Sequence, residues 1–275
     1  MSRSSLANRR PHLPAESDAA VPRASGEHPI ARRAQRHGLL RVTSRRAFRA
    51  ITDDALVTPL PIDRDGPRRL LNIAVAAIGL ILTSPIFVVI AVLVKLTSRG
   101  PIFFTQTRLG VNQRRPPSPD DTGRRRFNYG GRPFTIYKFR TMTVAPKGGE
   151  QQVWARPDDA RVTPIGRVLR KYRLDELPQL FNALLGDMNV VGPRPEQPAI
   201  AVRLRREIRG YHRRQRVAPG ITGLAQISQG YDRSLEDVRL KLVYDLQYIR
   251  RRSVWEDLRI MLRTLPVMLL GRGGW

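Results

Sequence analysis

Two adjacent carboxylates, Asp175 and Glu176, lie in a strongly basic stretch of the sequence. The basic residues around them are Arg167, Arg170, Lys171 and Arg173, followed further on by Arg194 between two prolines. Acids in a cationic neighbourhood can hold a phosphate group through a metal ion. The same residues would also suit a structural role, with Asp175 as a helix cap and Glu176 as an acid of the first turn. Their types and spacing leave both interpretations open.

Apolar residues follow the acids at helical spacing. The residues at positions i, i+3, i+4, i+7 and i+8 are Leu177, Leu180, Phe181, Leu184 and Leu185. This pattern predicts a short helix with a buried apolar face. Asp175 stands at its N-cap position, Pro178 falls in its first turn, and Gly186 is suited to end it. We therefore expect the acids at the N-terminus of this helix, where the helix dipole and the free N–H groups favour anions.

The composition narrows the classes of partner. The chain of 275 residues has a formal net charge of +26, which points to nucleic acid, acidic lipid or a phosphorylated substrate. Aromatic residues make up only 7%, few for a protein that stacks nucleic-acid bases, so no nucleic acid is expected. The absence of cysteine excludes disulfides and thiolate metal sites. Three of the four histidines lie in the N-terminal tail, which argues against a histidine-built zinc site.

Three regions differ in composition. Residues 1–65 are rich in Arg, Ser, Ala and Pro and are predicted to form a disordered basic arm, either on an anionic membrane surface or in solvent. No apolar core of the usual length follows the early arginines, so the arm does not have the pattern of a secretory signal. Residues 66–98 contain the strongly hydrophobic run, and residues 99–275 have the mixed composition of a folded domain.

The hydrophobic run extends from Leu70 to Leu96 and carries no charge before Lys95, so it is long enough to span a bilayer as one helix. Ser84 and Pro85 fall near its middle, where proline removes a helix hydrogen bond and serine can help to replace it. The basic flanks are Arg64, Arg68 and Arg69 before the run and Lys95, Arg99 and Arg108 after it. A spanning helix usually has its positive charge on one side. The symmetric flanks therefore favour a re-entrant helix–break–helix, with a kinked span as the alternative.

The chain after the run predicts short extended segments. They are expected at Pro101–Thr105 and Arg132–Met142, separated by a polar loop at Asn112–Gly131. The second segment carries Lys138 and Arg140, which are either surface charges or ligands of a phosphate.

Helices are predicted for much of the remaining chain. They comprise a helix that begins at Thr163-Pro164 and the segments Ile200–Gln215, Ser234–Arg252 and Val254–Leu270. Between them, Arg216–Ser228 contains Pro219-Gly220 and Gly223, which mark tight turns where a backbone can approach a ligand closely. The last helix is amphipathic and is expected either in the bilayer interface or in the protein core.

Several long sequence motifs, in order from about Arg69 to Leu270, resemble those of the bacterial sugar transferase family. These motifs are LTSP, VKLTSRGPIFFTQTRLG, YKFRTM, RVTPIGRVLRKYRLDELPQLFNALLGDMNVVGPRP and PGITGLAQIS. The family contains the monotopic polyprenyl-phosphate phosphoglycosyl transferases, and this chain is similar to their compact form. The resemblance implies a helix-rich α/β fold: a re-entrant membrane helix–break–helix, interfacial amphipathic helices and a small cytoplasmic catalytic domain.

The resemblance also implies a reaction. The family moves a sugar-1-phosphate from a UDP-sugar to polyprenyl (undecaprenyl) phosphate at the cytoplasmic face of the bacterial inner membrane. It implies Asp175 as the nucleophile that expels UMP and Glu176 as a catalytic acid that holds Mg²⁺. The implied substrate- and phosphate-binding residues are Lys138, Arg140, Arg170, Arg194 and Thr222, and the implied membrane re-entry is at Ser84 and Pro85. Anionic lipid is a further expected partner, and a homodimer is left open.

Some residues depart from the pattern of the family. Asn72 stands where relatives often have an acid early in the membrane helix, and the loop Asn112–Gly131 is longer than usual. Two other functions remain as alternatives. One is a non-catalytic, membrane-anchored adaptor with a basic surface, and the other is a glycosyltransferase that moves the sugar alone and releases UDP.

Overall fold

A computed structural model describes residues 66–112, 130–143, 159–230 and 234–270 of the chain. The predicted arm at 1–65 and nearly all of the predicted loop at 112–131 lie outside these described residues. Two small sheets and several helices make up the described part, which is helix-rich α/β as expected.

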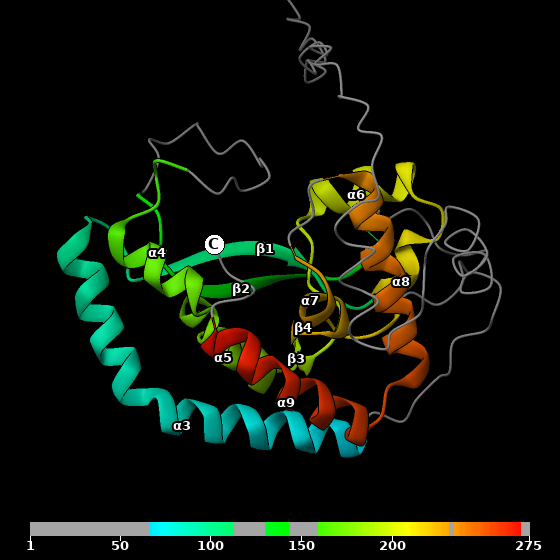
Figure 1. Cartoon of the computed structure of the whole chain (residues 1–275), viewed down its shortest axis with the longest axis horizontal. Helices are drawn as coiled ribbons and strands as arrows, with labels where there is room; N and C mark the ends of the chain where they lie inside the picture. The colour runs from blue at the N-terminus through cyan, green and yellow to red at the C-terminus, as the bar shows by residue number, and fades with distance from the viewer. Residues whose placement is uncertain (1–65, 113–129, 144–158, 231–233, 271–275) are drawn as a thin grey trace, which may run out of the picture. The chain divides into compact units, whose positions relative to one another are not determined.

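The first element, α3, is one continuous helix of 32 residues, Gly66–Thr97, with Pro85 in its interior. Figure 1 shows that α3 bends strongly along its length, so that its two arms run in different directions. A proline inside a helix has no N–H for the carbonyl four residues earlier, which is that of Ile81. The Ser84 hydroxyl donates to this carbonyl at 2.8 Å. The prediction of a break is therefore wrong in one respect: Ser84 replaces the lost hydrogen bond, and the helix bends without ending.

Much of the α3 surface is uncovered. Within the described part of the chain it is the helix long and apolar enough to cross a membrane, and only 11% of its most apolar stretch is buried. The exposed apolar residues include Leu70, Ile78, Ile81, Leu82, Val88, Val89 and Leu96. A narrow face, with Asn72, Ala76, Ile90 and Val94, is buried against the rest of the protein.

The basic residues before α3 do not behave as free flanking charges. Arg68 is buried and donates from Nε to Asp257 Oδ2 at 2.9 Å and from Nη2 to the Tyr248 hydroxyl at 2.6 Å. Arg69 donates to the backbone carbonyls of Ala183 and Leu184 at 2.5 and 2.6 Å. Both arginines therefore join α3 to other elements of the domain, a role that the sequence did not predict.

Two small sheets carry the loops of the site. Strands β1 (Phe103–Leu109) and β2 (Pro133–Phe139) are antiparallel, and Phe104 pairs with Lys138 in their register. Strands β3 (Asn189–Val191) and β4 (Gly220–Thr222) form a parallel pair. The first extended segment was predicted a few residues too early, and the sequence pattern did not predict β3 and β4.

Among the helices after β2, the last two match their predicted bounds within a residue, whereas α5 and α6 do not. Their bounds are α4 Pro164–Lys171, α5 Gln179–Leu185, α6 Pro198–Glu207, α7 Leu224–Ser228, α8 Leu235–Arg251 and α9 Val254–Leu269, with 3-10 helices η1 at Leu174–Glu176 and η2 at Tyr211–Arg216. The Thr163 hydroxyl accepts from Gly166 N at 3.0 Å, which confirms the predicted start of α4. The predicted helix Ile200–Gln215 is wrong as one element, since Gly210 has a positive φ of 76° between α6 and η2.

The packing of α5 agrees with the prediction only in part, since Leu180 and Leu184 are partly buried against the core. Its buried residues are Gln179, Asn182 and Ala183, whereas Phe181 and Leu185 are 45% and 69% exposed. The Asn182 amide explains this orientation, because it donates to Thr135 O at 2.7 Å and accepts from Tyr137 N at 3.2 Å. Asn182 thus satisfies the open edge of β2, and the face with Phe181 and Leu185 turns away from the sheet.

The core surrounds α8, where Val238, Leu242 and Ile249 are buried as predicted. In α9, by contrast, Asp257 and Ile260 are buried, while Trp255, Leu262, Leu265 and Leu269 are exposed. Ile260 belongs to the core and Met261 packs against it, so one face of α9 contributes to the core while another face is exposed. Figure 1 shows α3, α5 and α9 together along one edge of the domain, with both sheets on the same side of them.

Candidate active site

The acid pair lies on η1, which follows a tight turn after α4. Arg173 makes this turn with a φ of 55°, the only positive φ of a non-glycine residue in the described part of the chain. Asp175 and Glu176 are then both buried, at 7% and 6% exposure. Neither η1 nor α5 has a side-chain cap hydrogen bond, and α5 begins only after Pro178. The prediction of Asp175 as an N-cap is therefore wrong, because the turn at Arg173 places both acids one turn before the helix.

Glu176 is held by cations from two distant elements. Lys138 Nζ, on β2, donates to Glu176 Oε1 at 2.8 Å. Arg194 binds both carboxylate oxygens, with Nη2 at 2.5 Å from Oε1 and Nη1 at 3.2 Å from Oε2. Burial alone would raise the pKa of Glu176, but Arg194 and Lys138 outweigh it and hold this pKa well below its ordinary value. Glu176 is thus a fixed carboxylate anion.

Asp175 is placed differently. Its closest cation is Lys138, whose Nζ lies 3.9 Å from Oδ2, and within the described residues its carboxylate accepts no hydrogen bond. Burial raises the pKa of Asp175 above its ordinary value, against the opposing charge of Lys138. The neighbouring Glu176 raises this pKa further, and Arg170 and Arg194 lower it. Of the two acids, Asp175 therefore has its oxygens available for a reaction.

Two other predicted cations have different positions. Arg170 donates from Nε to Thr141 Oγ1 at 2.9 Å, and its charge reaches Asp175. Arg140 instead turns to the end of α3, where it donates to Ser98 O at 2.7 Å and Ser98 Oγ at 3.0 Å. The expectation that Arg140 faces the phosphate site is therefore corrected. Since β2 ends at residue 139, its alternation no longer keeps Arg140 on the same side as Lys138.

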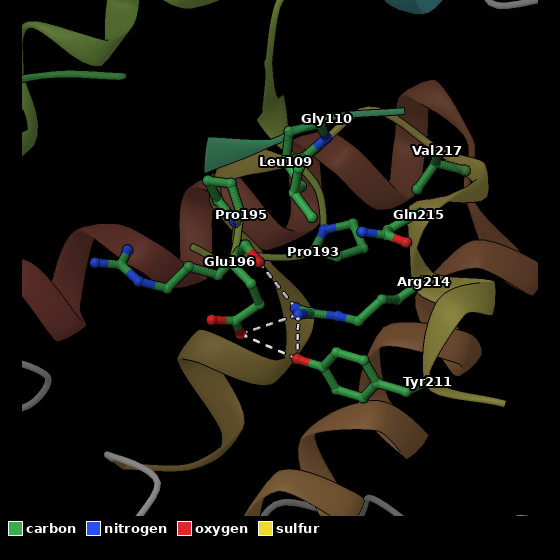
Figure 2. A pocket seen from close by; sticks show the side chains of 11 residues that line it. Leu109, Gly110, Pro193, Pro195, Glu196, Tyr211, Arg214, Gln215 and Val217 are labelled. Carbon is green, nitrogen blue, oxygen red and sulfur yellow. Dashed lines mark hydrogen bonds and ion pairs between the residues drawn. The ribbon is translucent and has the colours of Figure 1, made fainter. Parts of the chain in front are cut away.

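The sequence reasoning missed a second charged cluster that supports Arg194. Glu196 follows Arg194 by two residues and accepts from Lys241 Nζ at 2.8 Å and Arg214 Nη1 at 3.0 Å. Arg214 also donates to the backbone carbonyl of Arg194 at 2.9 Å and to Asp245 Oδ2 at 2.8 Å. Figure 2 shows Glu196 and Arg214 pointing toward each other beside the proline loop. The only signal in the sequence was the acid directly after Pro-Arg-Pro.

This cluster is structural in character. Burial would raise the pKa of Glu196, but Lys241 and Arg214 outweigh it and depress this pKa strongly. The hollow beside it measures only about 20 Å³, too small for a substrate. The cluster therefore fixes the backbone that carries Arg194.

Thr222 lies in the wall of a cavity that Glu176 also lines. Its hydroxyl shares a hydrogen bond of 2.8 Å with Thr264 Oγ1 of α9, and the cavity measures about 270 Å³. The close approach predicted for this turn is between two parts of the backbone. Gly192 N donates to Thr222 O at 2.9 Å, and a Cβ on Gly220 would collide with the backbone of Gly192. The glycine therefore permits the β3–β4 contact and does not by itself indicate a ligand.

Asn72, the departure in the membrane helix, is fully buried. Its Oδ1 accepts from Val190 N at 2.8 Å, and its Nδ2 donates to Arg68 O at 2.8 Å and Asn189 Oδ1 at 3.1 Å. The amide can donate and accept at once, so it joins α3 to β3 without a buried charge.

The fold and the site together define a protein with a buried acid pair among cationic side chains, beside uncovered apolar helices. Comparison with known proteins then gives the family: residues 64–117 and 121–271 match the bacterial sugar transferase family, and the chain belongs to it. The resemblance inferred from the sequence motifs is thereby confirmed.

Three relatives illustrate the similarity. The chain is 41% identical over 206 residues to a UDP-N-acetylgalactosamine-undecaprenyl-phosphate N-acetylgalactosaminephosphotransferase of Aeromonas hydrophila, covering 75% of this chain and 44% of that protein. It is 43% identical over 200 residues to a UDP-glucose:undecaprenyl-phosphate glucose-1-phosphate transferase of Klebsiella pneumoniae, covering 72% and 39%. A protein of the same description from Caulobacter vibrioides is 39% identical over 214 residues, covering 77% and 73%. The chain thus spans less than half the length of the first two relatives.

Proposed function

We propose that this chain transfers a sugar-1-phosphate from a UDP-sugar to polyprenyl phosphate through a covalent intermediate on Asp175. The observation that carries the proposal is the difference between the two acids. Glu176 is bound by Lys138 and Arg194, whereas Asp175 beside it accepts no hydrogen bond from a described residue. The descriptions of the three relatives, all undecaprenyl-phosphate sugar phosphotransferases, support the donor and acceptor classes.

The first half-reaction would begin at an Asp175 carboxylate oxygen. This oxygen attacks the sugar-linked phosphorus of the UDP-sugar, the bridging phosphorus–oxygen bond breaks, and UMP leaves with the bridging oxygen. A phosphate oxygen of the lipid then attacks the same phosphorus and releases the Asp175 carboxylate. The products are the polyprenyl diphosphate sugar and the original enzyme, so no further reactant is required.

The basic residues suit this chemistry because phosphoryl transfer depends mainly on positioning and charge neutralisation. Lys138 lies within reach of both carboxylates, at 2.8 Å from Glu176 and 3.9 Å from Asp175. We propose that Lys138, Arg170 and Arg194 neutralise the diphosphate as it approaches two acids. Glu176 would keep Lys138 and Arg194 in place.

Mg²⁺ is the proposed cofactor, and the donor set fits it. The described residues contain no group of three or more acids and histidines that could enclose a metal. Mg²⁺ is ordinarily bound by one or two carboxylates together with substrate phosphates. Asp175 and Glu176 can provide the carboxylates. We propose Glu176 as its protein ligand, shared with the two cations. When bound, the ion would offset the negative charge of the diphosphate. Chelation is expected to stop UMP release and added Mg²⁺ to restore it.

The membrane arrangement forms part of the proposal. The exposed apolar surfaces of α3, α5 and α9 support a chain seated in one leaflet. The bend in α3 near its middle supports re-entry at Ser84 and Pro85, with the rest of the domain at the cytoplasmic face (Figure 1). Such a position gives access to a soluble UDP-sugar and a lipid phosphate, as the first membrane step in assembling an exopolysaccharide, capsule, O-antigen or glycoprotein glycan would require.

Nucleotide release tests the proposal. The full chain in nanodiscs would receive polyprenyl phosphate, Mg²⁺ and one UDP-sugar at a time. UMP is expected with at least one sugar and is expected to disappear in Asp175→Asn. Asp187→Asn is the matched control, because Asp187 is a partly exposed aspartate outside the acid pair. Release of UDP would replace this mechanism with transfer of the sugar alone, and a folded protein without turnover across the panel would favour a non-catalytic adaptor.

A further inference from the structure

An apolar cavity of about 270 Å³ lies directly beside the acid pair. Its walls come from elements far apart in the chain: α3, α5, the β3–β4 pair, α7 and α9. Ten of its fifteen lining residues are Val, Leu, Ile or Met, including Leu180, Val190, Ile227 and Met261. Methionine side chains adapt their shape to flexible apolar ligands. The walls therefore suit a hydrocarbon chain.

One part of the cavity has a different character. Arg173 and Glu176 line it together, and Thr222 lies there with its hydroxyl bonded to Thr264. Arg173 Nη1 lies 3.9 Å from Glu176 Oε2, so its guanidinium is at the border between the acid pair and the apolar walls. A ligand with an anionic head and an apolar tail matches this distribution of charge.

The cavity is continuous with the exposed apolar surface of the protein. Leu265 of α9 lines the cavity and is also 55% exposed. Leu262, one turn away, is 69% exposed and does not line the cavity. A long hydrocarbon chain can therefore enter past Leu265 and continue outside, along the exposed apolar face of α3. A UDP-sugar fits poorly, because its polar uracil and ribose would lie mostly against apolar side chains.

We propose that this cavity binds the isoprene units nearest the phosphate of the polyprenyl phosphate acceptor, with that phosphate beside Arg173 and within reach of Asp175. This inference rests on the proposed function and adds the subsite for its lipid substrate. The position is chemically consistent, because the second half-reaction needs the lipid phosphate next to the phosphosugar on Asp175. The apolar walls would select for an isoprenoid chain over a soluble phosphate.

Two measurements test the cavity separately from the reaction. The first is binding without turnover: farnesyl phosphate with a photoreactive group on its second isoprene unit is cross-linked to the full chain in nanodiscs, and the labelled peptides are identified. Labelling of α7 and α9 that unlabelled farnesyl phosphate removes is the expected result. Labelling confined to the outer face of α3, or competition by a phospholipid but not by farnesyl phosphate, would overturn the proposal.

The second measurement compares two leucines of α9. Leu265→Trp is expected to weaken cross-linking and to raise the KM for polyprenyl phosphate by about tenfold or more, as a misfit in an apolar pocket does. Leu262→Trp, the same change on the same helix outside the cavity, is expected to alter neither. The UMP burst from UDP-sugar without acceptor shows that each variant is folded. Equal KM values for the two variants would refute the cavity proposal and leave the proposed function intact. Specific cross-linking without any UMP release would support the cavity proposal and refute the proposed function.

Discussion

Lys138 controls the ionisation of Asp175, and its removal gives a measurable prediction. Its ammonium lies 3.9 Å from Asp175 Oδ2 and 2.8 Å from Glu176 Oε1, on a side chain that is only 16% exposed. The positive charge opposes the rise in the pKa of Asp175 that burial causes. In Lys138→Met this opposition is lost, so the pKa of Asp175 is expected to move further upward.

The size of the effect follows from the distance. Unit charges about 3.9 Å apart interact by about 4 kcal/mol at an effective dielectric constant of about 20, which corresponds to about three pKa units as an upper value. Arg170 and Arg194 still act on Asp175 in the variant, which reduces the change. We expect the acid limb of the pH–rate profile to move upward by about one to three units. At pH values below the shifted pKa the rate then falls by up to about tenfold for each unit of the shift, and it recovers in part as the pH rises.

The assay is the UMP burst from UDP-sugar without lipid acceptor, measured across pH. Omitting the acceptor removes the ionisation of the lipid phosphate from the profile. Lys171→Met is the matched control, because Lys171 is exposed on α4 and the change in charge is the same. A Lys138→Met profile that keeps the wild-type acid limb, or loses activity equally at every pH, would refute the assignment of Asp175 as an ionised nucleophile controlled by Lys138.

Three further predictions concern the residues that position the site. Glu196→Gln removes the carboxylate that pairs with the buried Lys241 and is expected to lower the free energy of unfolding by about 3 kcal/mol in urea titrations. Folding depresses the pKa of Glu196, so this loss of stability is fully present above the unfolded pKa of about 4.5 and shrinks as the pH falls below it. A Cβ at Gly166 would collide with the backbone carbonyl of residue 141, so Gly166→Ala is expected to destabilise the protein by about 2 kcal/mol, and an unchanged melting temperature would contradict this packing. Ser84→Ala leaves the carbonyl of Ile81 without its donor and is expected to lower stability in nanodiscs by about 1–2 kcal/mol, with Ser84→Thr, which keeps a hydroxyl, as the control.

Local sequence patterns predicted the features that depend on near neighbours. Thr163 caps α4 as predicted, because a cap requires only a hydroxyl two or three residues before a free N–H. The apolar run predicted α3 from its length and lack of charge, and Pro85 located the cause of its bend. The adjacent acids and their basic surroundings were also visible in the sequence, but a structural and a catalytic role both remained open.

Tertiary structure decided which side chains these elements bring together. The apolar spacing of α5 correctly predicted a helix but wrongly included Phe181 and Leu185 in its buried face, because it could not show that Asn182 would bind the open edge of β2. Strands β3 and β4 have three residues each, too few to show a period. Arg68 was counted as a membrane flank, since its partner Asp257 is 189 positions away.

The acid pair shows most clearly what the sequence determines and what depends on the tertiary structure. The sequence determined that two carboxylates stand together in a cationic region, but their difference depends on Lys138 from β2 and Arg194 from the proline loop. Only the tertiary structure brings these cations to Glu176 and leaves Asp175 without a hydrogen bond within the described residues. The physical reason is range: helix propensity, capping and hydrophobic period act within a few residues, whereas burial and charge pairing depend on whichever segments the fold places side by side.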